Sequence, residues 1–386
     1  MEYVNLSDLI VAAKNNRCGD CDFPVLSITK NDGIVLQSEK FKKRIASKDT
    51  ANYKVVHRGQ LVQGIHIDEA NFGIQEVVDI GIVSPAYKIW DIKRNAIVPK
   101  YLEVVLRSPR SIAYYASKFN GSIKRRERLS DKDFLQMRIP CPSVDEQIYA
   151  IEVLDKTIAL IDSRKQQLSE LDNFIKARFV EMFGDPIGNP MGWPTQTMKN
   201  ASVRLSDGPF GSNLKSAHYT AKGVRVIRLG NIGCGYFNDA DKSFIPEEHY
   251  EKLKKYTCRA GEIIIATLGD PNLRACLIPS YVEFGINKSD CVHYIPKANL
   301  LNNQFVCQYI NCPETLTLAS GMIHGQTRAR ISSGQLADLP IFLPPMNLQE
   351  QFAAFVEQTD KSKVVVQKAL NEAQILFDSL MQQYFG

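Results

Sequence analysis

Two arginine-rich clusters are the residues whose type and spacing are best suited to binding chemistry. They comprise Lys124, Arg125, Arg126 and Arg128 in one place, and Arg328 and Arg330 in another. A guanidinium is a planar fork of N–H donors that fits a phosphate or the O6/N7 edge of guanine. Gly121 and Gly325 lie close by and would let the backbone approach DNA. The clusters therefore favour contact with DNA, the alternative being a solvated turn whose arginines pair with acidic helices.

Further basic and polar positions are weaker candidates for the same role. A basic run near the start of the chain would either contact phosphates or form a solvated face. It contains Lys40, Lys42, Lys43 and Arg44. In the second half of the chain, expected loop positions select Lys215, Arg228, Asn231 and Arg274. An asparagine amide can pair with adenine through two hydrogen bonds, so Asn231 is a candidate for base contact.

The motifs of enzymes that act on nucleic acids are missing. Asn189-Pro-Met-Gly192 is the nearest approach to the Asn/Asp-Pro-Pro-aromatic motif of amino-methyltransferases, and it reads better as a linker. The chain has no Gly-x-x-x-x-Gly-Lys-Ser/Thr loop for ATP. Asp91-Ile-Lys93 is the one fragment resembling a metal-dependent nuclease, and the six histidines are dispersed. We therefore expect no catalytic residue and no cofactor on this chain.

The cysteines and the apolar segments bound the cellular setting. The nine cysteines have irregular spacings, which favours reduced thiols in the cytoplasm. Cys18 and Cys21 have the spacing of a zinc or redox pair, but no second pair follows, so a structural or incidental role is favoured. No apolar run approaches the roughly 20 residues of a membrane helix, and no secretion signal is evident. We expect a cytoplasmic protein without a membrane partner and without a bound metal.

An internal repeat at a spacing of 202 residues organises the chain. Arg126-Glu-Arg-Leu-Ser130 matches Arg328-Ala-Arg-Ile-Ser332, and Pro142 matches Pro344. Each copy closes on Phe-Gly, at Gly184 and at Gly386. A Glu-Gln pair follows each proline, Glu146-Gln147 and Glu350-Gln351, which implies a two-residue slip at the second helix entry and two non-equivalent helices.

Each copy of the repeat ends in a segment that predicts a long helix. Residues 145–183 and 348–385 contain neither proline nor glycine. Apolar residues recur at steps of three, four and seven, the period of coiled-coil packing. The first seam is Leu154, Ile161, Leu168, Ile175 and Met182, with Ile151 and Ile158 in a second seam. The seam of the second helix is Val366, Leu370, Ala373, Phe377, Leu380 and Tyr384.

The remaining segments read as mixed and rich in strands. Strand character is present at 24–28, 60–63, 86–90, 224–229 and 262–267, and short helices are expected at 101–106 and 304–309. The expected division is 1–140, 141–186, 187–340 and 341–386. This is an α+β chain in which two mixed α/β domains alternate with two long helices. We expect the helices to pair as an antiparallel coiled coil, giving a pseudo-twofold shape.

Charge separates along the same boundaries. Residues 1–140 carry a net charge of +7 and residues 187–340 carry +4, whereas 141–186 carry −4 and 341–386 carry −2. Basic domains suit phosphate binding, and acidic helices suit a different task.

The composite pattern resembles the specificity subunits of type I restriction–modification systems. The resemblance rests on the full-length alternation, the long helices with their proline entries, and three segments of the second domain: Ser206-Asp-Gly-Pro-Phe-Gly211, Arg228-Leu-Gly-Asn-Ile232 and Gly261-Glu-Ile-Ile-Ile-Ala-Thr267. It implies two target-recognition domains that each read one half of a split double-stranded DNA site, with the helices setting the gap.

The resemblance also implies partners. Two methyltransferase subunits that use S-adenosylmethionine to methylate adenine would dock on the helices. A motor-nuclease subunit using ATP and Mg would add restriction. Two alternatives stay open at this point: a stand-alone DNA-modifying or DNA-cleaving enzyme, which would act with magnesium or S-adenosylmethionine, and a helical scaffold for protein interactions, which would show no DNA preference.

Overall fold

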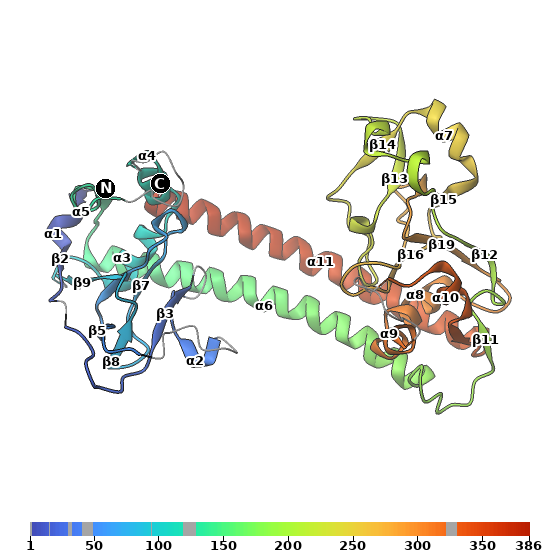
Figure 1. Cartoon of the computed structure of the whole chain (residues 1–386), viewed down its shortest axis with the longest axis horizontal. Coiled ribbons are helices and arrows are strands. Elements are labelled where there is room, and N and C mark those ends of the chain that lie inside the picture. Colours follow the sequence, from blue (N-terminus) through green and yellow to red (C-terminus); the bar gives the residue numbers. More distant parts are fainter. Residues whose placement is uncertain are drawn as a thin grey trace. The chain divides into compact units, whose positions relative to one another are not determined.

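The chain forms two compact units, and the first of them is assembled from two distant parts of the sequence. The computed structural model describes residues 2–14, 16–29, 33–40, 49–93, 95–118, 129–321 and 330–386. Unit 1 consists of Met1–Lys165 and Lys368–Gly386, and unit 2 of Gln166–Gln367. Each unit therefore contains sheets, short helices and part of both long helices (Figure 1).

Unit 1 is built around a four-stranded antiparallel sheet with the order β2-β9-β6-β7. Three two-stranded sheets accompany it: β1-β10, β3-β4 and β5-β8. The strands are β1 (Tyr3–Asn5), β2 (Ile10–Ala12), β3 (Leu26–Thr29), β4 (Gly33–Leu36), β5 (Lys54–His57), β6 (Leu61–Gln63), β7 (Phe72–Ile74), β8 (Ile80–Val83), β9 (Lys88–Ile92) and β10 (Arg138–Pro140). The helices are α1 (Leu6–Leu9), α2 (Gln37–Lys40), η1 (Ile67–Glu69), α3 (Pro99–Leu106), α4 (Pro109–Lys118), α5 (Asp131–Leu135) and the start of α6 (Val144–Phe183).

Unit 2 repeats this plan with a larger second sheet. Its sheets have the orders β12-β19-β16-β17, β14-β13-β18-β15 and β11-β20. The strands are β11 (Thr195–Thr197), β12 (Ser202–Ser206), β13 (Val224–Ile227), β14 (Ser243–Ile245), β15 (Thr257–Arg259), β16 (Ile263–Ala266), β17 (Arg274–Leu277), β18 (Phe284–Asn287), β19 (Cys291–Pro296) and β20 (Pro340–Phe342). The helices are η3 (Gly211–Asn213), η4 (Ser216–His218), η5 (Leu229–Asn231), α7 (Glu247–Leu253), η6 (Lys254–Tyr256), α8 (Asn303–Asn311), α9 (Pro313–Ser320), α10 (Ser333–Asp338) and the start of α11 (Met346–Phe385).

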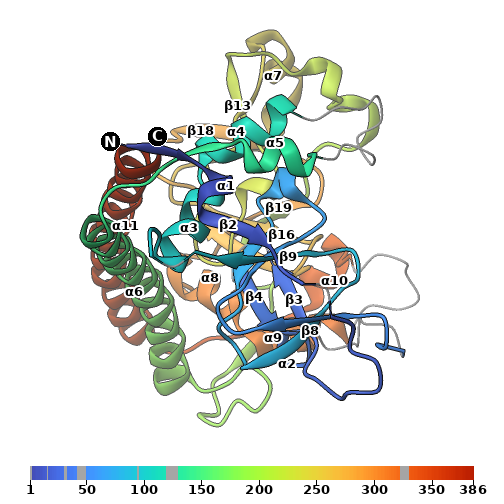
Figure 2. The same cartoon turned by 90° about the vertical axis from the view of Figure 1, so that its left-hand side faces the viewer.

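The core of unit 1 joins the sheet to the two long helices through α3. Leu61, Phe72 and Trp90 of the sheet share one buried cluster with Tyr101 of α3 and with Phe385 at the end of α11. Figure 2, with unit 1 toward the viewer, shows α3 between the strands and the long helices. Burial of this apolar surface is the main force holding the helices on the sheet.

The core of unit 2 contains an aromatic cluster at the junction of the two long helices. The rings of Phe179 and Phe352 are 5.4 Å apart between centroids, and those of Phe174 and Phe355 are 5.0 Å apart. Lys363 Nζ lies 2.7 Å from the carboxylate of Asp172. Positions rise along α6 as they fall along α11, so the two helices run antiparallel in this unit.

A buried glutamine fixes the start of each long helix. Both Gln147 and Gln349 are fully buried. Gln147 donates through Nε2 to the carbonyls of Ala96 and Pro142, and its Oε1 accepts from the amide of Val98. Gln349 likewise donates to the carbonyls of Leu300 and Pro344, and it accepts from the amide of Asn302. Two of the three bonds thus join each helix to the loop before α3 or α8, and the third joins it to the proline at its own entry.

This arrangement corrects the expected two-residue slip at the second helix entry. The partner of Gln147 is Gln349, at the exact spacing of the repeat, whereas Glu350 and Gln351 are exposed. Both helices contain 40 residues, and their ends are related by the same spacing. The two copies of the repeat differ in length at a point before the long helices. The hydroxyl of Ser111 donates to the carbonyl of Val105, and the hydroxyl of Thr315 donates to the carbonyl of Tyr309, so these matching bonds are 204 residues apart. The two extra residues of the first copy therefore fall between Ser111 and Ser130.

The expected α+β class with two long helices is confirmed. Strands lie at all five expected segments, and α3 and α8 cover the two expected short helices. Ser130 and Ser332, which the repeat aligns, both cap a short helix by accepting from a backbone amide.

Replacing either glutamine by alanine should destabilise the unit that contains it. Gln349→Ala leaves the amide of Asn302 and two carbonyls without a buried partner, and each such loss costs about 1–3 kcal/mol. We expect a lower denaturation midpoint in urea for Gln147→Ala and Gln349→Ala. Gln351→Ala is the matched control because its side chain is exposed. Equal midpoints for Gln349→Ala and Gln351→Ala would contradict the assignment.

Candidate nucleic-acid interface

The structure describes five of the thirteen residues proposed for DNA contact. Lys215, Arg228, Asn231, Arg274 and Arg330 are among the described residues. The other eight lie outside the described residues: Lys42, Lys43, Arg44, Lys124, Arg125, Arg126, Arg128 and Arg328. The site can therefore be built in unit 2, where loops from both sheets approach one another.

Tyr219 is flanked by two cations from different loops. The guanidinium of Arg228 and the ammonium of Lys288 each lie 5.6 Å from the centre of the Tyr219 ring. Such cation–π contacts hold charged groups near the surface while leaving part of their hydration intact. The hydroxyl oxygen of Tyr219 is buried and has no hydrogen-bond partner among the described residues. The loop before β13 and the end of β18 are thus joined by a positively charged aromatic contact.

Arg330 forms a second contact of the same kind beside the loop after β12. Its guanidinium lies 5.6 Å from the centre of the Phe210 ring, and Phe210 is about half exposed. Arg330 Nε lies 2.6 Å from Asp290 Oδ1, and Nη2 lies 3.9 Å from Asp207 Oδ2. Burial raises the pKa of Asp207, and the negative charge of Asp290 adds to the shift. Arg330 is therefore an ion-paired arginine.

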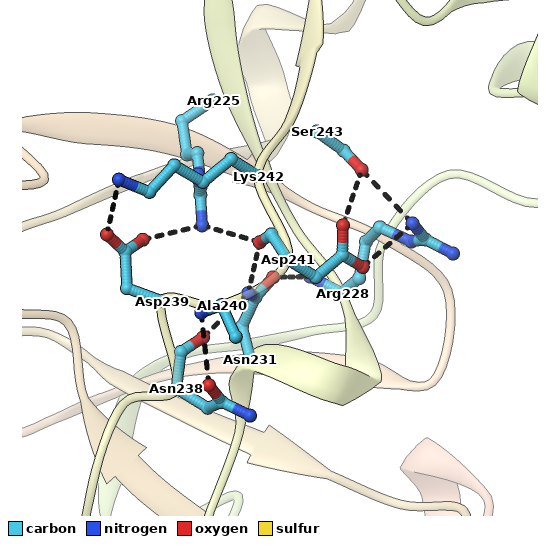
Figure 3. Close-up of polar contacts among 9 residues, drawn as sticks. All are labelled: Arg225, Arg228, Asn231, Asn238, Asp239, Ala240, Asp241, Lys242 and Ser243. Atoms are coloured by element: carbon cyan, nitrogen blue, oxygen red, sulfur yellow. Dashed lines mark hydrogen bonds and ion pairs between the residues drawn. The ribbon is translucent and has the colours of Figure 1, made fainter. Parts of the chain in front are cut away.

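Asn231 has a structural role. Its side chain is fully buried, Nδ2 donates to the carbonyls of Asn238 and Asp241, and Oδ1 accepts from the amide of Arg228. Figure 3 shows these bonds at the centre of a network that reaches Arg225. Since every polar atom of the amide is engaged inside the protein, Asn231 presents no edge to a base.

The same network fixes Arg228 at the rim. Arg228 Nη1 lies 2.9 Å from Asp241 Oδ2 and donates to the hydroxyl of Ser243 (Figure 3). Its side chain remains 38% exposed, so a phosphate could approach the open part of the guanidinium. Arg225, in contrast, is only 8% exposed and pairs with Asp239, which makes it part of the framework.

Arg274 also serves the framework. Its guanidinium donates to four carbonyl oxygens, those of Leu229, Ile232, Leu268 and Pro271. These bonds tie η5 to the loop after β16. Because Nε, Nη1 and Nη2 of Arg274 all donate to these carbonyls, Arg274 supports the loops that carry the interface. It does not offer DNA a free pair of N–H donors.

Lys215 fits the expected loop position. Its side chain is exposed, and the described residues offer it no ion-pair partner. The amide of Lys215 donates to His218 Nδ1. The His218 ring is tilted against that of His249 with the ring centres 4.2 Å apart, and His249 Nε2 contacts the carbonyl of Asn213. The loop that carries Lys215 is thus attached to α7.

Sequence reasoning missed Lys288, Tyr219 and Phe210. Phe210 lies in the Ser206–Gly211 segment that carried the family resemblance, and its exposure on a glycine-rich loop is a usable signal. Gly208 is required there because a Cβ would come within 2.3 Å of the backbone of Lys288. Lys288 and Tyr219 come together only through the pairing of β13 with β18, which the sequence does not reveal.

Unit 1 has a cationic cluster of its own among the described residues. Burial lowers the pKa of Lys54, and the nearby charges of Lys88 and Arg17 add to the effect. Lys54 Nζ donates to the carbonyl of Tyr87, and Lys88 pairs with Asp131. A neighbouring anion would stabilise the charged form of Lys54 against the burial and the cations that lower its pKa.

The described residues hold no group of three or more His, Cys, Asp or Glu side chains arranged for a metal ion. Asp91 accepts from Gln60, and Lys93 donates to the carbonyl of Ser7, so both members of the nuclease-like fragment have other partners. Within the described ranges, no helix combines the length and apolar character needed to cross a membrane.

All nine cysteines are free thiols. Cys18 is buried and donates to the carbonyl of Cys21. Cys21 and Cys234 are the exposed thiols, Cys141 is half-buried, and the others are buried. Burial raises the pKa of Cys276 and Cys312 to about 12, and it raises the pKa of Cys234 and Cys141 as well.

The residues proposed for the helix seam differ in burial. Leu154, Ile161 and Ile175 are buried. The other five are half-buried: Leu168, Val366, Leu370, Phe377 and Leu380. Ile158, which we placed in a second seam, is 42% exposed, so that seam is not continuous. Several other apolar residues on the two helices are exposed: Phe174, Val180, Val364, Val365, Ile375 and Leu376.

Comparison with known proteins gives sequence matches to two curated proteins. One is the type I restriction enzyme MjaVIII specificity subunit of Methanocaldococcus jannaschii, 22% identical over 62% of this chain. The other is the type I restriction enzyme StySPI specificity subunit of Salmonella potsdam, 22% identical over 64% of this chain. The chain is similar to type I specificity subunits. The matches span 60% and 55% of those relatives' length, and no protein-family model matches the chain.

Solved structures share the fold along the whole chain. A chain from a structure on complex assembly and conformational transition of the type I R-M system gives a TM-score of 0.61 at 14% identity, covering 100% of this chain and 97% of that one. The type I restriction–modification S subunit from M. genitalium gives 0.52 at 13% identity, covering 100% and 96%. The resemblance inferred from the sequence is therefore confirmed.

Asn231→Ala should act on stability. The substitution leaves the amide of Arg228 and the carbonyl of Asn238 without their partner, at about 1–3 kcal/mol for each buried group, and it removes one of the two donors to the carbonyl of Asp241. We expect a lower melting temperature, measured by circular dichroism. Asn200→Ala is the control, because Asn200 is exposed. An unchanged melting temperature together with weaker DNA binding would instead support a base contact by Asn231.

Proposed function

We propose that this chain is the sequence-recognition subunit of a type I restriction–modification system and has no catalytic role. The observation that carries the proposal is the sequence match to two type I specificity subunits, and the whole-chain fold likeness supports it. In this proposal the chain binds double-stranded DNA, while S-adenosylmethionine, ATP and Mg are bound by partner subunits.

Each half of the chain would read one half of a split DNA site. The assigned target-recognition domains are residues 1–140 and 187–340, and the spacer regions are 141–186 and 341–386. Both recognition domains are basic, with net charges of +7 and +4. Phosphate contacts would supply affinity, and a few base contacts would supply specificity. The equal 40-residue helices would set a fixed gap, with the two halves related by a pseudo-twofold axis.

In the second domain, the cation–aromatic rim would contact the DNA backbone. We define this rim as Phe210, Tyr219, Arg228, Lys288 and Arg330. Its cations come from separate loops, and Lys215 adds an exposed charge on the loop before Tyr219. The arginine clusters predicted from the sequence would contribute at the corresponding place in each domain, before α5 and before α10.

The helices would bind the methyltransferase subunits. Exposed apolar side chains on both helices support a protein-binding role: Phe174 of α6 is 56% exposed, and Val364 and Ile375 of α11 are 70% and 68% exposed. Large apolar groups in water favour burial against a partner. Two such subunits, and a motor-nuclease subunit in addition, would complete the enzyme.

Selection from a random duplex DNA library tests this function. The whole chain, purified with its companion methyltransferase, should recover two short fixed blocks separated by an unspecified gap. Binding should be tightest at low salt, because phosphate contacts release counterions. A single recovered block would refute the two-domain assignment. No enrichment would favour the scaffold interpretation, and cleavage or methylation by the chain alone would favour an enzyme.

Lengthening both helices tests the proposed ruler. Insertion of one helical turn at equivalent positions of α6 and α11 should add one to two base pairs to the gap, because a turn advances about 5.4 Å. Selected sequences before and after insertion provide the measurement. The control is an insertion of equal length in the Gly184–Gly192 linker, which lies outside the helices and should leave the gap unchanged. An unchanged gap in the helix variant would exclude the ruler.

A further inference from the structure

Arg330 forms ion pairs with two carboxylates of unit 2, those of Asp207 and Asp290. The Arg330 side chain is 39% exposed, while the side chains of Asp207 and Asp290 are only 10% and 19% exposed. Two acids face one arginine, so the group carries one negative charge in excess when both acids are ionised. A DNA phosphate that approaches Arg330 would meet a guanidinium that is already neutralised and a net negative charge below it.

The surrounding backbone holds all three residues in place. Asp207 Oδ1 accepts from the amides of Gly208 and Asp290, at 2.7 and 2.9 Å. Asp290 has a left-handed backbone with φ of 66°, and its carbonyl accepts from the amide of Thr267. Arg330 bridges to Leu268 in a short antiparallel pairing. Because the backbone of all three residues is fixed, Arg330 can turn toward DNA only by a side-chain rotation that breaks its ion pairs with the two acids.

Unit 1 lacks this pair of acids at the equivalent positions. Gly59 and Gly261, both with positive φ, precede Leu61 and Ile263 by two residues. Leu61 pairs with Trp90 and Trp90 with Ala12, as Ile263 pairs with Tyr294 and Tyr294 with Leu205. The same turn precedes β9 and β19, closed by the amides of Tyr87 and Cys291.

Counting from these pairs places Lys14 at the position of Asp207 and Ala86 at that of Asp290. At this position of the shared strand pairing, unit 1 therefore has a lysine where unit 2 has an aspartate. The acids are therefore not a requirement of the fold, since unit 1 forms the same strand pairs without them.

We infer that Asp207 and Asp290 restrain Arg330 from binding DNA phosphates of any sequence, which makes the pair a specificity-determining element of unit 2. The inference rests on the proposed DNA-recognition function. The two carboxylates take the place beside the guanidinium that a phosphate would take. Contact between Arg330 and DNA therefore forms only where the DNA makes enough further interactions to displace the carboxylates. Unit 1, with Lys14 in place of the acid, contributes more of the sequence-independent affinity.

The test is binding of the whole chain to a fluorescent random-sequence duplex. The Asp207→Asn/Asp290→Asn variant keeps an oxygen that can accept from the amides of Gly208 and Asp290 but loses both charges. We expect roughly fivefold to tenfold tighter binding in about 0.1 M salt, and a plot of log K against log salt that is steeper by about one, as one added phosphate contact requires. The melting temperature of each variant is measured alongside.

The matched control is Glu248→Gln/Glu251→Gln on α7, which changes the net charge equally and also frees two cations, Lys252 and Lys254. We expect less than a twofold change in affinity for this control. Arg330→Gln should abolish the gain in the Asp207→Asn/Asp290→Asn background.

The outcomes separate the inference from the function on which it rests. A wild-type chain that binds no duplex at low salt defeats the proposed function, and the inference with it. A binding wild type with unchanged or weakened binding in the folded asparagine variant refutes the inference alone, since the acids would then be neutral or would position Arg330 for DNA. An equal gain in the α7 control would attribute the effect to net charge, which also refutes it.

Discussion

The three hydrogen bonds of the buried glutamine are the constraint on which each half of this chain depends. Gln147 and Gln349 fix the first turn of a 40-residue helix against the loop that enters α3 or α8. A shift of one residue at this point would rotate the rest of the helix by about 100° and turn its apolar seam away from its partner. One amide side chain therefore sets the register between the sheets and the helix.

A common frame with exchangeable loops follows from this constraint. The strand pairs that include Leu61 and Ile263 and the helix starts at Gln147 and Gln349 correspond between the two units, whereas the loops around them differ in length and charge. The acids around Arg330 have no counterpart beside Lys14. Because the frame is held by backbone pairing and by buried side chains, its rim can change charge without disturbing the core.

Sequence periodicity predicted the frame better than the rim. Apolar spacing predicted both long helices, since a seam of heptads has few other solutions, and the spacing of 202 aligned the Phe-Gly pairs at their ends. The error at Glu350 arose because a glutamine lies on either side of this residue, and either could be the partner of Gln147. Only burial distinguishes Gln349 from Gln351. Asn231 and Arg274 were chosen from their expected loop positions, but hydrogen bonds to backbone carbonyls, which a sequence does not display, gave them structural roles.

The distribution of thiols has a practical consequence. Cys21 belongs to unit 1 and Cys234 to unit 2, and these two are the exposed cysteines of the chain. Six others are buried. A maleimide dye reacts with accessible thiolates, so brief labelling would place one fluorophore on each unit without engineered sites. Energy transfer between the two dyes would then report in real time on any change in their separation as duplex is added.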